Sequence, residues 1–316
     1  MIALVNKYKG SFILLITAFI WGIAFVFQKD SMDYVGPFTF LAFRGFITAI
    51  ILIPLSFIIE NHKKVDKGKI NYKVEIIAGI LSGLFLFLGS SFQQVGLVTV
   101  SVTKGGFLTS TYIVLVPIIG LLFKKKTTIK NWICMIISLI GFYILSCGDM
   151  LFQGELIKPE SGDIVVLLGA LFFAFQIIII DNYVEKVNAM RLNGYSFLVV
   201  GIISFIIAML KETITFEGIK GAIISILYVS IFSSCIAYTL QIVGQKYTKP
   251  DVATLIMSLE SVFALIGGVI FLSENLKYNE IIGCVIIFIC VILSQISIKK
   301  NINNIDNVLD KHNCYK

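Results

Sequence analysis

Two ionisable side chains lie within long apolar stretches of the sequence, and they are the first candidates for chemistry. Arg44 lies in FTFLAFRGFITAIIL (residues 38–52), and Glu260 lies in MSLESVFALIGG (residues 257–268). A guanidinium stays ionised in proteins, and a charge surrounded by hydrocarbon is costly. Each residue therefore needs water or a polar partner, which predicts either a bridge between structural elements or a site for a solute or a proton.

The depth of each charge separates these alternatives. Arg44 lies roughly 10 Å from the nearer end of its apolar run, at about 1.5 Å per helical residue. Its long side chain could reach the headgroup region, or it could face a central cavity and bind an anionic group or a carboxylate; Thr48 on the same helical face favours the cavity. Glu260 lies near the middle of its run, where headgroups are out of reach. It could bridge helices, or it could bind a substrate amine or a coupling proton.

Polar side chains also recur at helical spacing along two other apolar runs. Hydroxyls and amides in such positions could bond across helices, or they could form two walls of one polar cavity. The residues are Ser82, Ser90 and Gln93 in the first run, and Ser230, Ser234, Tyr238 and Gln241 in the second.

Three further residues complete the candidate site. Trp21 could pack in the core or line the cavity, and Lys104 could reach outward to the headgroups. Tyr112 is the counterpart of Glu260 in an internal repeat described below. We therefore expect the cavity residues to come from Glu260, Arg44, Trp21, Ser90, Gln93, Lys104, Tyr112, Tyr238 and Gln241.

The elements that position these residues must be membrane-spanning helices. The chain has 316 residues, of which 57% are apolar and 14% charged, and its mean hydropathy is +0.93. A soluble domain has about 45–50% apolar and about 25% charged residues. Apolar runs of about 20 residues are long enough to cross a bilayer as helices. We expect ten of them, at roughly 11–28, 35–59, 74–96, 102–123, 130–148, 163–182, 189–210, 219–241, 251–272 and 279–298.

Basic residues predict the orientation of these helices. With the N-terminus inside, the inner segments hold 19 lysines and arginines and the outer loops hold 5. Cytoplasmic loops carry such an excess, so we expect a multi-pass protein of the cell membrane with both termini cytoplasmic. The net charge of +7 is accounted for by these loops, and no nucleic-acid partner is expected.

The two halves of the chain are similar to each other. When the first half is shifted by 148 residues, 9 of 42 aligned positions from Ser82 to Phe123 are identical, among them Gln93 with Gln241 and Gly120 with Gly268. Each half has five expected helices, and an odd number makes the second half enter the membrane from the opposite side. Inverted repeats of this kind are typical of secondary transporters, whose sites lie near the bilayer midplane.

Several segments resemble the EamA-like branch of the drug/metabolite transporter superfamily. They include ITAFIWGIAFVFQK (16–29), FLAFRG (40–45), the hairpin at 93–120, and residues 257–287 with Glu274 and Gly283. The resemblance covers about 10–147 and 161–297 and implies ten helices. With the repeat and the charge bias, we expect a first half at 1–148, an extracytoplasmic linker at 149–161, a second half at 162–298 and a cytoplasmic tail at 299–316. The resemblance also implies transport of a metabolite.

We therefore expect a secondary transporter that moves a small metabolite, an amino acid or a related solute, by alternating access, with efflux as the favoured direction. Its partners would be the solute, the lipid bilayer and, through Glu260, protons. The alternatives are an intramembrane enzyme or a membrane sensor without transport. Catalysis is not expected, because no HExxH or G-x-S-x-G motif is present. No metal or cofactor is expected either, since neither histidine lies in an apolar run.

Overall fold

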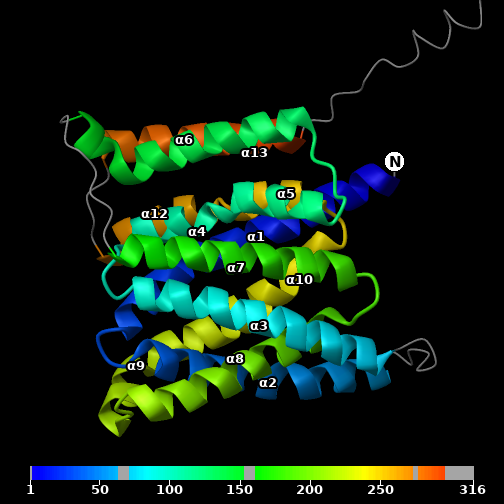
Figure 1. Cartoon of the computed structure of the whole chain (residues 1–316), viewed down its shortest axis with the longest axis vertical. Coiled ribbons are helices and arrows are strands. Elements are labelled where there is room, and N and C mark those ends of the chain that lie inside the picture. The colour runs from blue at the N-terminus through cyan, green and yellow to red at the C-terminus, as the bar shows by residue number, and fades with distance from the viewer. Residues whose placement is uncertain (1, 63–70, 153–160, 273–276, 296–316) are drawn as a thin grey trace, which may run out of the picture.

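The fold is described by a computed structural model, which covers residues 2–62, 71–152, 161–272 and 277–295. Every regular element in these residues is a helix (Figure 1). In chain order they are α1 (Ile2–Ser31), α2 (Pro37–His62), α3 (Tyr72–Gly96), α4 (Val102–Ser110), α5 (Tyr112–Leu122), α6 (Ile129–Phe152), α7 (Ser161–Tyr183), α8 (Ala189–Lys211), α9 (Phe216–Tyr228), the π-helix η2 (Val229–Ala237), α10 (Tyr238–Gln245), α11 (Pro250–Met257), α12 (Glu260–Leu272) and α13 (Tyr278–Gln295).

These helices make ten spans. Nine described segments are long and apolar enough to cross a membrane, and three of these combine shorter elements: α4 with α5, α9 with η2 and α10, and α11 with α12. The tenth is α6, whose apolar stretch Ile129–Leu145 is shorter but whose helix continues to Phe152. The prediction of an all-α, polytopic membrane protein is confirmed.

The beginning of α1 and the end of α13 lie at the same face of the bundle, which we call the N-terminal face. Ser11 donates a hydrogen bond to Gln295, and Lys130 at the start of α6 donates to the carbonyl of Leu293. At the opposite face, Lys29 near the end of α1 donates to the carbonyl of Leu97. Which face is cytoplasmic stays a prediction, and the expected tail at 299–316 lies outside the described residues.

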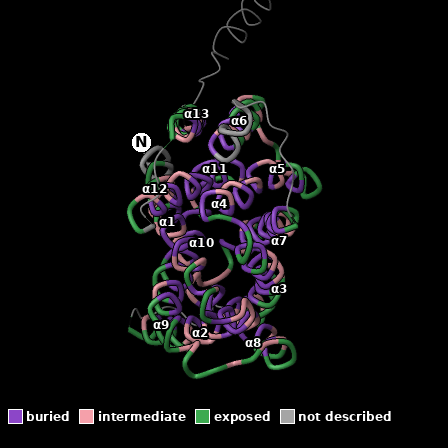
Figure 2. Tube along the Cα trace, turned by 90° about the vertical axis from the view of Figure 1, so that its left-hand side faces the viewer, coloured by how far each residue is buried: buried purple, intermediate pink, exposed green. Residues whose placement is uncertain are grey.

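The two sets of five spans pack as matching repeats. In one contact α3 of the first set packs against α7 of the second. In the equivalent contact the counterpart of α3, which consists of α9, η2 and α10, packs against α1. Three spans contact their own counterparts: α6 contacts α13 at one end of the molecule and α2 contacts α8 at the other (Figure 2), while α4 and α5 contact α12 and α11 between them. The second set begins at the opposite face because each set has five spans. The exact limits of the halves stay a prediction, and residues 153–160 of the expected linker are outside the described part.

Two spans are broken at equivalent positions. α4 ends at Ser110 and α5 begins at Tyr112, while α11 ends at Met257 and α12 begins at Glu260. The turns have short-range bonds such as Thr111 N to Leu108 O (3.3 Å) and Ser261 N to Ser258 O (3.2 Å). The two breaks meet where the hydroxyls of Ser110 and Ser261 lie 3.0 Å apart. Spans were expected at 102–123 and 251–272, and both are present, but the break within each span was not predicted.

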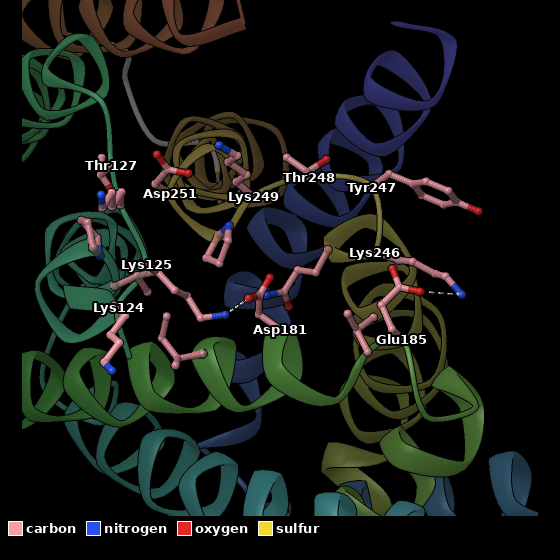
Figure 3. A pocket seen from close by; sticks show the side chains of 18 residues that line it. Lys124, Lys125, Thr127, Asp181, Glu185, Lys246, Tyr247, Thr248, Lys249 and Asp251 are labelled. Atoms are coloured by element: carbon pink, nitrogen blue, oxygen red, sulfur yellow. Dashed lines mark hydrogen bonds and ion pairs between the residues drawn. The ribbon is translucent and has the colours of Figure 1, made fainter. Parts of the chain in front are cut away.

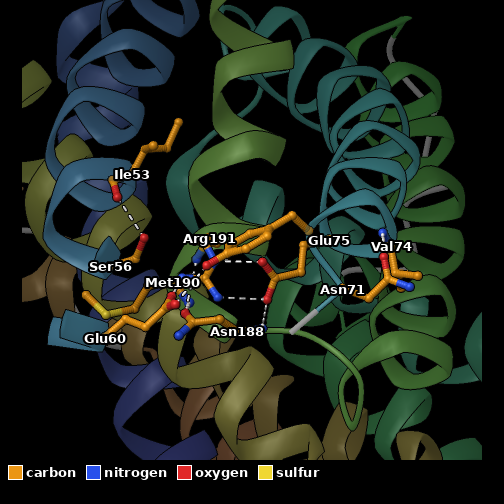
Figure 4. A network of polar contacts seen from close by, with 10 residues as sticks. Ile53, Ser56, Glu60, Asn71, Val74, Glu75, Asn188, Met190 and Arg191 are labelled. Atoms are coloured by element: carbon orange, nitrogen blue, oxygen red, sulfur yellow. Dashed lines mark hydrogen bonds and ion pairs between the residues drawn. The ribbon is translucent and has the colours of Figure 1, made fainter. Parts of the chain in front are cut away.

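A buried ionic network joins α2, α3 and α8 near the N-terminal face (Figure 4). Arg191 donates to both oxygens of Glu75, at 2.6 and 3.1 Å, and to Glu60. Tyr72 also donates to Glu60 at 2.8 Å, and the backbone N–H of Asn188 donates to Glu75 at 2.7 Å. Arg191 was counted above among the charges of the inner loops. Its side chain is 1% exposed inside this network, so it is buried in the bundle at that face.

Candidate functional site

A small cavity lies near the middle of the spans, between the two repeats. Its volume is about 30 Å³. Residues from α1, α2, α3, α4, α5, α7, η2, α10 and α12 line it: Trp21, Phe25, Gln28, Arg44, Gln93, Thr109, Tyr112, Phe173, Gln176, Ile177, Ser233, Tyr238, Gln241 and Glu260.

Arg44 is buried against the cavity and is held by neutral groups. Its Nε donates to the Ser234 hydroxyl at 2.6 Å, and its two terminal nitrogens make longer bonds of 3.4 Å to Gln28 and Ser233. The guanidinium also lies 5.7 Å from the centre of the Tyr238 ring. Among the residues that the structure describes, it makes no ion pair.

The π-helix η2 brings two serines to Arg44. Ser233 and Ser234 are consecutive in η2 and both bond the guanidinium. Neighbouring side chains diverge less in the wider turn of a π-helix than in an α-helix, and such segments are frequent at functional sites. The equivalent part of the other repeat lies within the α-helix α3, so this arrangement occurs in only one half of the described bundle.

Glu260 is buried at the break between α11 and α12. It is the first residue of α12 and is 3% exposed. The Ser110 hydroxyl lies 3.4 Å from its Oε1. No cation pairs with it within the described part of the chain. The cavity therefore has one buried guanidinium and one buried carboxyl group, and neither forms an ion pair within the described residues.

Aromatic and amide groups fill the space between these charges. The rings of Trp21 and Tyr238 are 4.7 Å apart. Gln93 donates to Thr109 at 2.9 Å from the other side of the cavity. The indole N–H of Trp21 and the Oε1 of Gln241 are buried without a hydrogen-bond partner in the described structure. These groups could bind a solute that is partly apolar and partly polar.

The wall of the cavity is built from repeat-related pairs. Gln93 and Gln241 both line it, and so do Tyr112 and Glu260, each pair being 148 residues apart. The same shift relates two pairs that the sequence analysis did not identify, namely Phe25 with Phe173 and Gln28 with Gln176. Extending the repeat comparison to residues 25–28 would have found them. Thr109, Ile177 and Ser233 have no such signal and were also missed.

Seven of the nine candidate residues lie in the cavity wall: Glu260, Arg44, Trp21, Gln93, Tyr112, Tyr238 and Gln241. Lys104 does not, because it pairs with Asp163 at 2.8 Å near the opposite face. Ser90 does not line the cavity either; it is buried in α3, 1% exposed, and its hydroxyl has no partner within the described residues. The roles of all nine in binding stay predictions.

A larger pocket opens at the N-terminal face, with a volume of about 630 Å³ (Figure 3). It extends inward to Val116, which lies about one helical turn from the cavity residue Tyr112, and to Ile178, which directly follows the cavity residue Ile177. Gln245 lies at this boundary and donates to the carbonyl of Ile177 at 3.0 Å. Toward the opposite face the cavity is bounded by a packed apolar cluster, which consists of Phe25, Val26, Leu97, Val102 and Ala264.

Comparison with known proteins agrees with this architecture. A crystal structure of another protein aligns with a TM-score of 0.72, at 13% identity, over 91% of this chain and 96% of that one. The chain is 33% identical over 286 residues to an uncharacterized transporter of Archaeoglobus fulgidus, covering 90% of this chain and 85% of the relative. It is 25% identical to the uncharacterized transporter YcxC of Bacillus subtilis, covering 90% of this chain and 91% of the relative.

A family model also matches both halves of the chain. The model is that of the EamA-like transporter family, and it matches residues 8–147 and 160–295. The two matched segments together cover most of the sequence and all ten spans. The chain therefore belongs to the EamA-like transporter family.

Proposed function

We propose that this protein is a secondary transporter that moves a small zwitterionic metabolite, an amino acid or a related solute, by alternating access. The observation that carries the proposal is that the Arg44 guanidinium and the Glu260 carboxyl group are both buried at one cavity and form no ion pair with any residue that the structure describes. A buried charge without a partner typically destabilises a protein by several kcal/mol. A solute with one carboxylate and one ammonium group would give each charge its partner.

The contacts of Arg44 suit exchange with such a solute. Its terminal nitrogens make only the two 3.4 Å bonds to Gln28 and Ser233. A carboxylate would accept two stronger, charge-assisted bonds from the same nitrogens. The short 2.6 Å bond from Nε to Ser234 would keep the guanidinium in position during this exchange.

The size of the cavity supports an alternating mechanism. At about 30 Å³ it holds a few water molecules, whereas sites for small organic ligands measure about 300–1,000 Å³. Solute binding thus requires the helices around the cavity to move apart. The pocket at the N-terminal face is the nearest route, since about one turn of helix separates it from the cavity.

Location and direction are also part of the proposal. The excess of basic residues at the N-terminal face supports a cell-membrane protein with both termini in the cytoplasm. The larger pocket then faces the cytoplasm, where a solute would enter in the proposed direction, export. The sequence contains no phosphate-binding loop, so an ion gradient is the expected energy source. Glu260 is the group in the cavity that could take up a proton when the solute leaves.

Flux through proteoliposomes tests the proposal. Thermal stabilisation of the purified protein by a panel of amino acids, sugars and purines first identifies a solute. Glu260→Gln should then abolish transport while leaving thermal unfolding near the wild-type temperature, because an amide cannot carry the charge or the proton. Arg44→Lys should keep part of the activity if charge is the requirement and lose it if two parallel bonds are. Glu185→Gln, at an exposed residue, is the matched control.

The same variants discriminate between a transport role and a structural one. If Glu260 only bridges helices, a glutamine can still accept a hydrogen bond from Ser110, and transport survives. Full activity of Glu260→Gln at every pH would therefore refute its role in the cycle. Stabilisation by sugars or purines and not by amino acids would refute the zwitterionic substrate class.

A further inference from the structure

Two ion pairs join the same two spans at opposite faces of the bundle. Lys104 of α4 pairs with Asp163 near the start of α7, and Lys125 just after α5 pairs with Asp181 near the end of α7. All four side chains are largely buried, from 7% to 27% exposed. Such pairs are screened less by water and salt than exposed pairs.

The central cavity lies between these two pairs. Asp163 and Asp181 are separated by about 27 Å along α7, at about 1.5 Å per residue. Halfway between them, α7 contributes Phe173 and Gln176 to the cavity wall. On the facing span, Thr109 and Tyr112 lie between the two lysines and line the same cavity. Each pair therefore lies between the cavity and a different face of the bundle.

The facing span is broken between its two lysines. α4 carries Lys104, α5 is followed by Lys125, and Thr111 lies in the turn that separates the two helices. A continuous helix would transmit a movement of one end to the other. A broken helix lets α4 and α5 move separately against α7, since a few residues at an element's end can absorb the change in backbone angles.

We propose that the Lys104–Asp163 and Lys125–Asp181 pairs are the two gates of the central cavity, with Thr111 as the hinge between them. The inference rests on the proposed transport function. Both pairs are formed in this structure, which fits a cavity too small for a solute. Opening toward the N-terminal face separates Lys125 from Asp181 and leaves the other pair intact, and opening toward the opposite face does the reverse.

Another pair at the N-terminal pocket provides a control. Lys246 and Glu185 are 3.5 Å apart and 44% and 66% exposed, and they join the end of α10 to the turn after α7 (Figure 3). Glu185 and Asp181 are four residues apart and line the same pocket. Glu185→Gln therefore removes one charge from the same pocket but leaves the contact between α5 and α7 in place, which makes it a control for Asp181→Asn.

Labelling of a cysteine in the cavity tests the gates without a known substrate. The six native cysteines are replaced by serine, and Thr109→Cys supplies the reporter. A membrane-impermeant maleimide is applied to intact cells and to inverted vesicles, so that each face is tested separately. Asp181→Asn should raise the labelling rate from the N-terminal face by at least about fivefold, as the loss of a coupling of ordinary size would. Asp163→Asn should raise the labelling rate from the opposite face and leave the rate from the N-terminal face unchanged.

Charge exchange and folding controls make the result decisive. Exchange of both charges, Lys125→Asp with Asp181→Lys, should return labelling to its original slow rate. Glu185→Gln should leave the rate unchanged. Equal increases from both faces, or no increase for either aspartate variant, would overturn the gates. If Asp181→Asn does not elute as folded protein, Lys125→Gln replaces it: this variant should raise the labelling rate from the N-terminal face, and the charge exchange should return it to the original rate.

The outcome is independent of the transport assay. If the protein transports a solute but the labelling rate is the same in wild type and in both aspartate variants, the transport function stands and the gate proposal is refuted. If each aspartate variant raises the labelling rate from one face only, but no solute in the panel is transported, the gate proposal stands and the transport function is refuted.

Discussion

Replacement of Arg191 by methionine should strongly destabilise the fold. The side chain fills the space between α2, α3 and α8 and makes two bonds to Glu75 and one to Glu60. Methionine keeps much of the volume but none of the donors. Two buried carboxylates, 5% and 2% exposed as residues, would then lose all three bonds from the guanidinium and keep those from the hydroxyl of Tyr72 and the N–H of Asn188.

The size of the effect follows from what remains buried. Removal of one partner from a buried ion pair costs about 3–5 kcal/mol, and two carboxylates left together place this variant near the upper end of that range. An exposed pair contributes about 0–1 kcal/mol, which is the expectation for Lys246→Gln at the pair with Glu185. On the scale known for domains of 150–250 residues, Arg191→Met should lower the unfolding temperature by roughly 10 °C.

Thermal unfolding of the detergent-purified protein, followed by intrinsic fluorescence, measures both variants. A third variant combines Arg191→Met with Glu60→Gln and Glu75→Gln. Because the penalty comes from uncompensated charge, removal of all three charges should restore most of the lost stability. The reasoning is refuted if Arg191→Met unfolds within about 2 °C of wild type, or if the triple variant is less stable than the single one.

Further predictions concern packing, capping and topology. Gly45→Val should destabilise the protein by about 1–3 kcal/mol, because a Cβ at Gly45 would lie 2.5 Å from the backbone of Gly201; Gly120→Ala, with its nearest neighbour at 3.5 Å, should unfold no earlier than wild type. Glu212→Gln should cost about 1–2 kcal/mol in the same assay, since the carboxylate accepts two backbone N–H bonds from the start of α2, at 2.9 and 2.7 Å. A fluorescent reporter at the C-terminus should be bright and alkaline phosphatase inserted at 149–161 active; a dark reporter with inactive phosphatase would reverse the topology.

Helix spans could be predicted from the sequence because hydropathy depends on composition alone. The breaks at Thr111 and before Glu260 could not, since apolar residues continue on both sides of each break. They accompany a tertiary contact, the meeting of Ser110 and Ser261 from opposite repeats. The hydropathy of a single apolar run contains no information on a contact with another run.

The site shows the same division. Arg44 and Glu260 stand out in the sequence because a charge within hydrocarbon needs an explanation, and the structure brings both to one cavity. Lys104 was assigned by the same rule, but its partner Asp163 lies 59 residues further along the chain and belongs to the next repeat. Periodicity along one helix cannot reveal a partner on another, so the pairing of Lys104 required the fold.

The fusion of both repeats into one polypeptide has a consequence for the polarity of the cavity. A homodimer of identical five-helix subunits would carry the same residue at both positions equivalent to 112 and 260, and every charge would occur twice. In the fused chain one position is a phenol, Tyr112, and the other a carboxylate, Glu260, while the position equivalent to Arg44 at the same shift is Leu192. The cavity wall therefore lacks the two-fold symmetry of the helices around it, and under the proposed function a bound molecule would have one preferred direction instead of two equivalent ones.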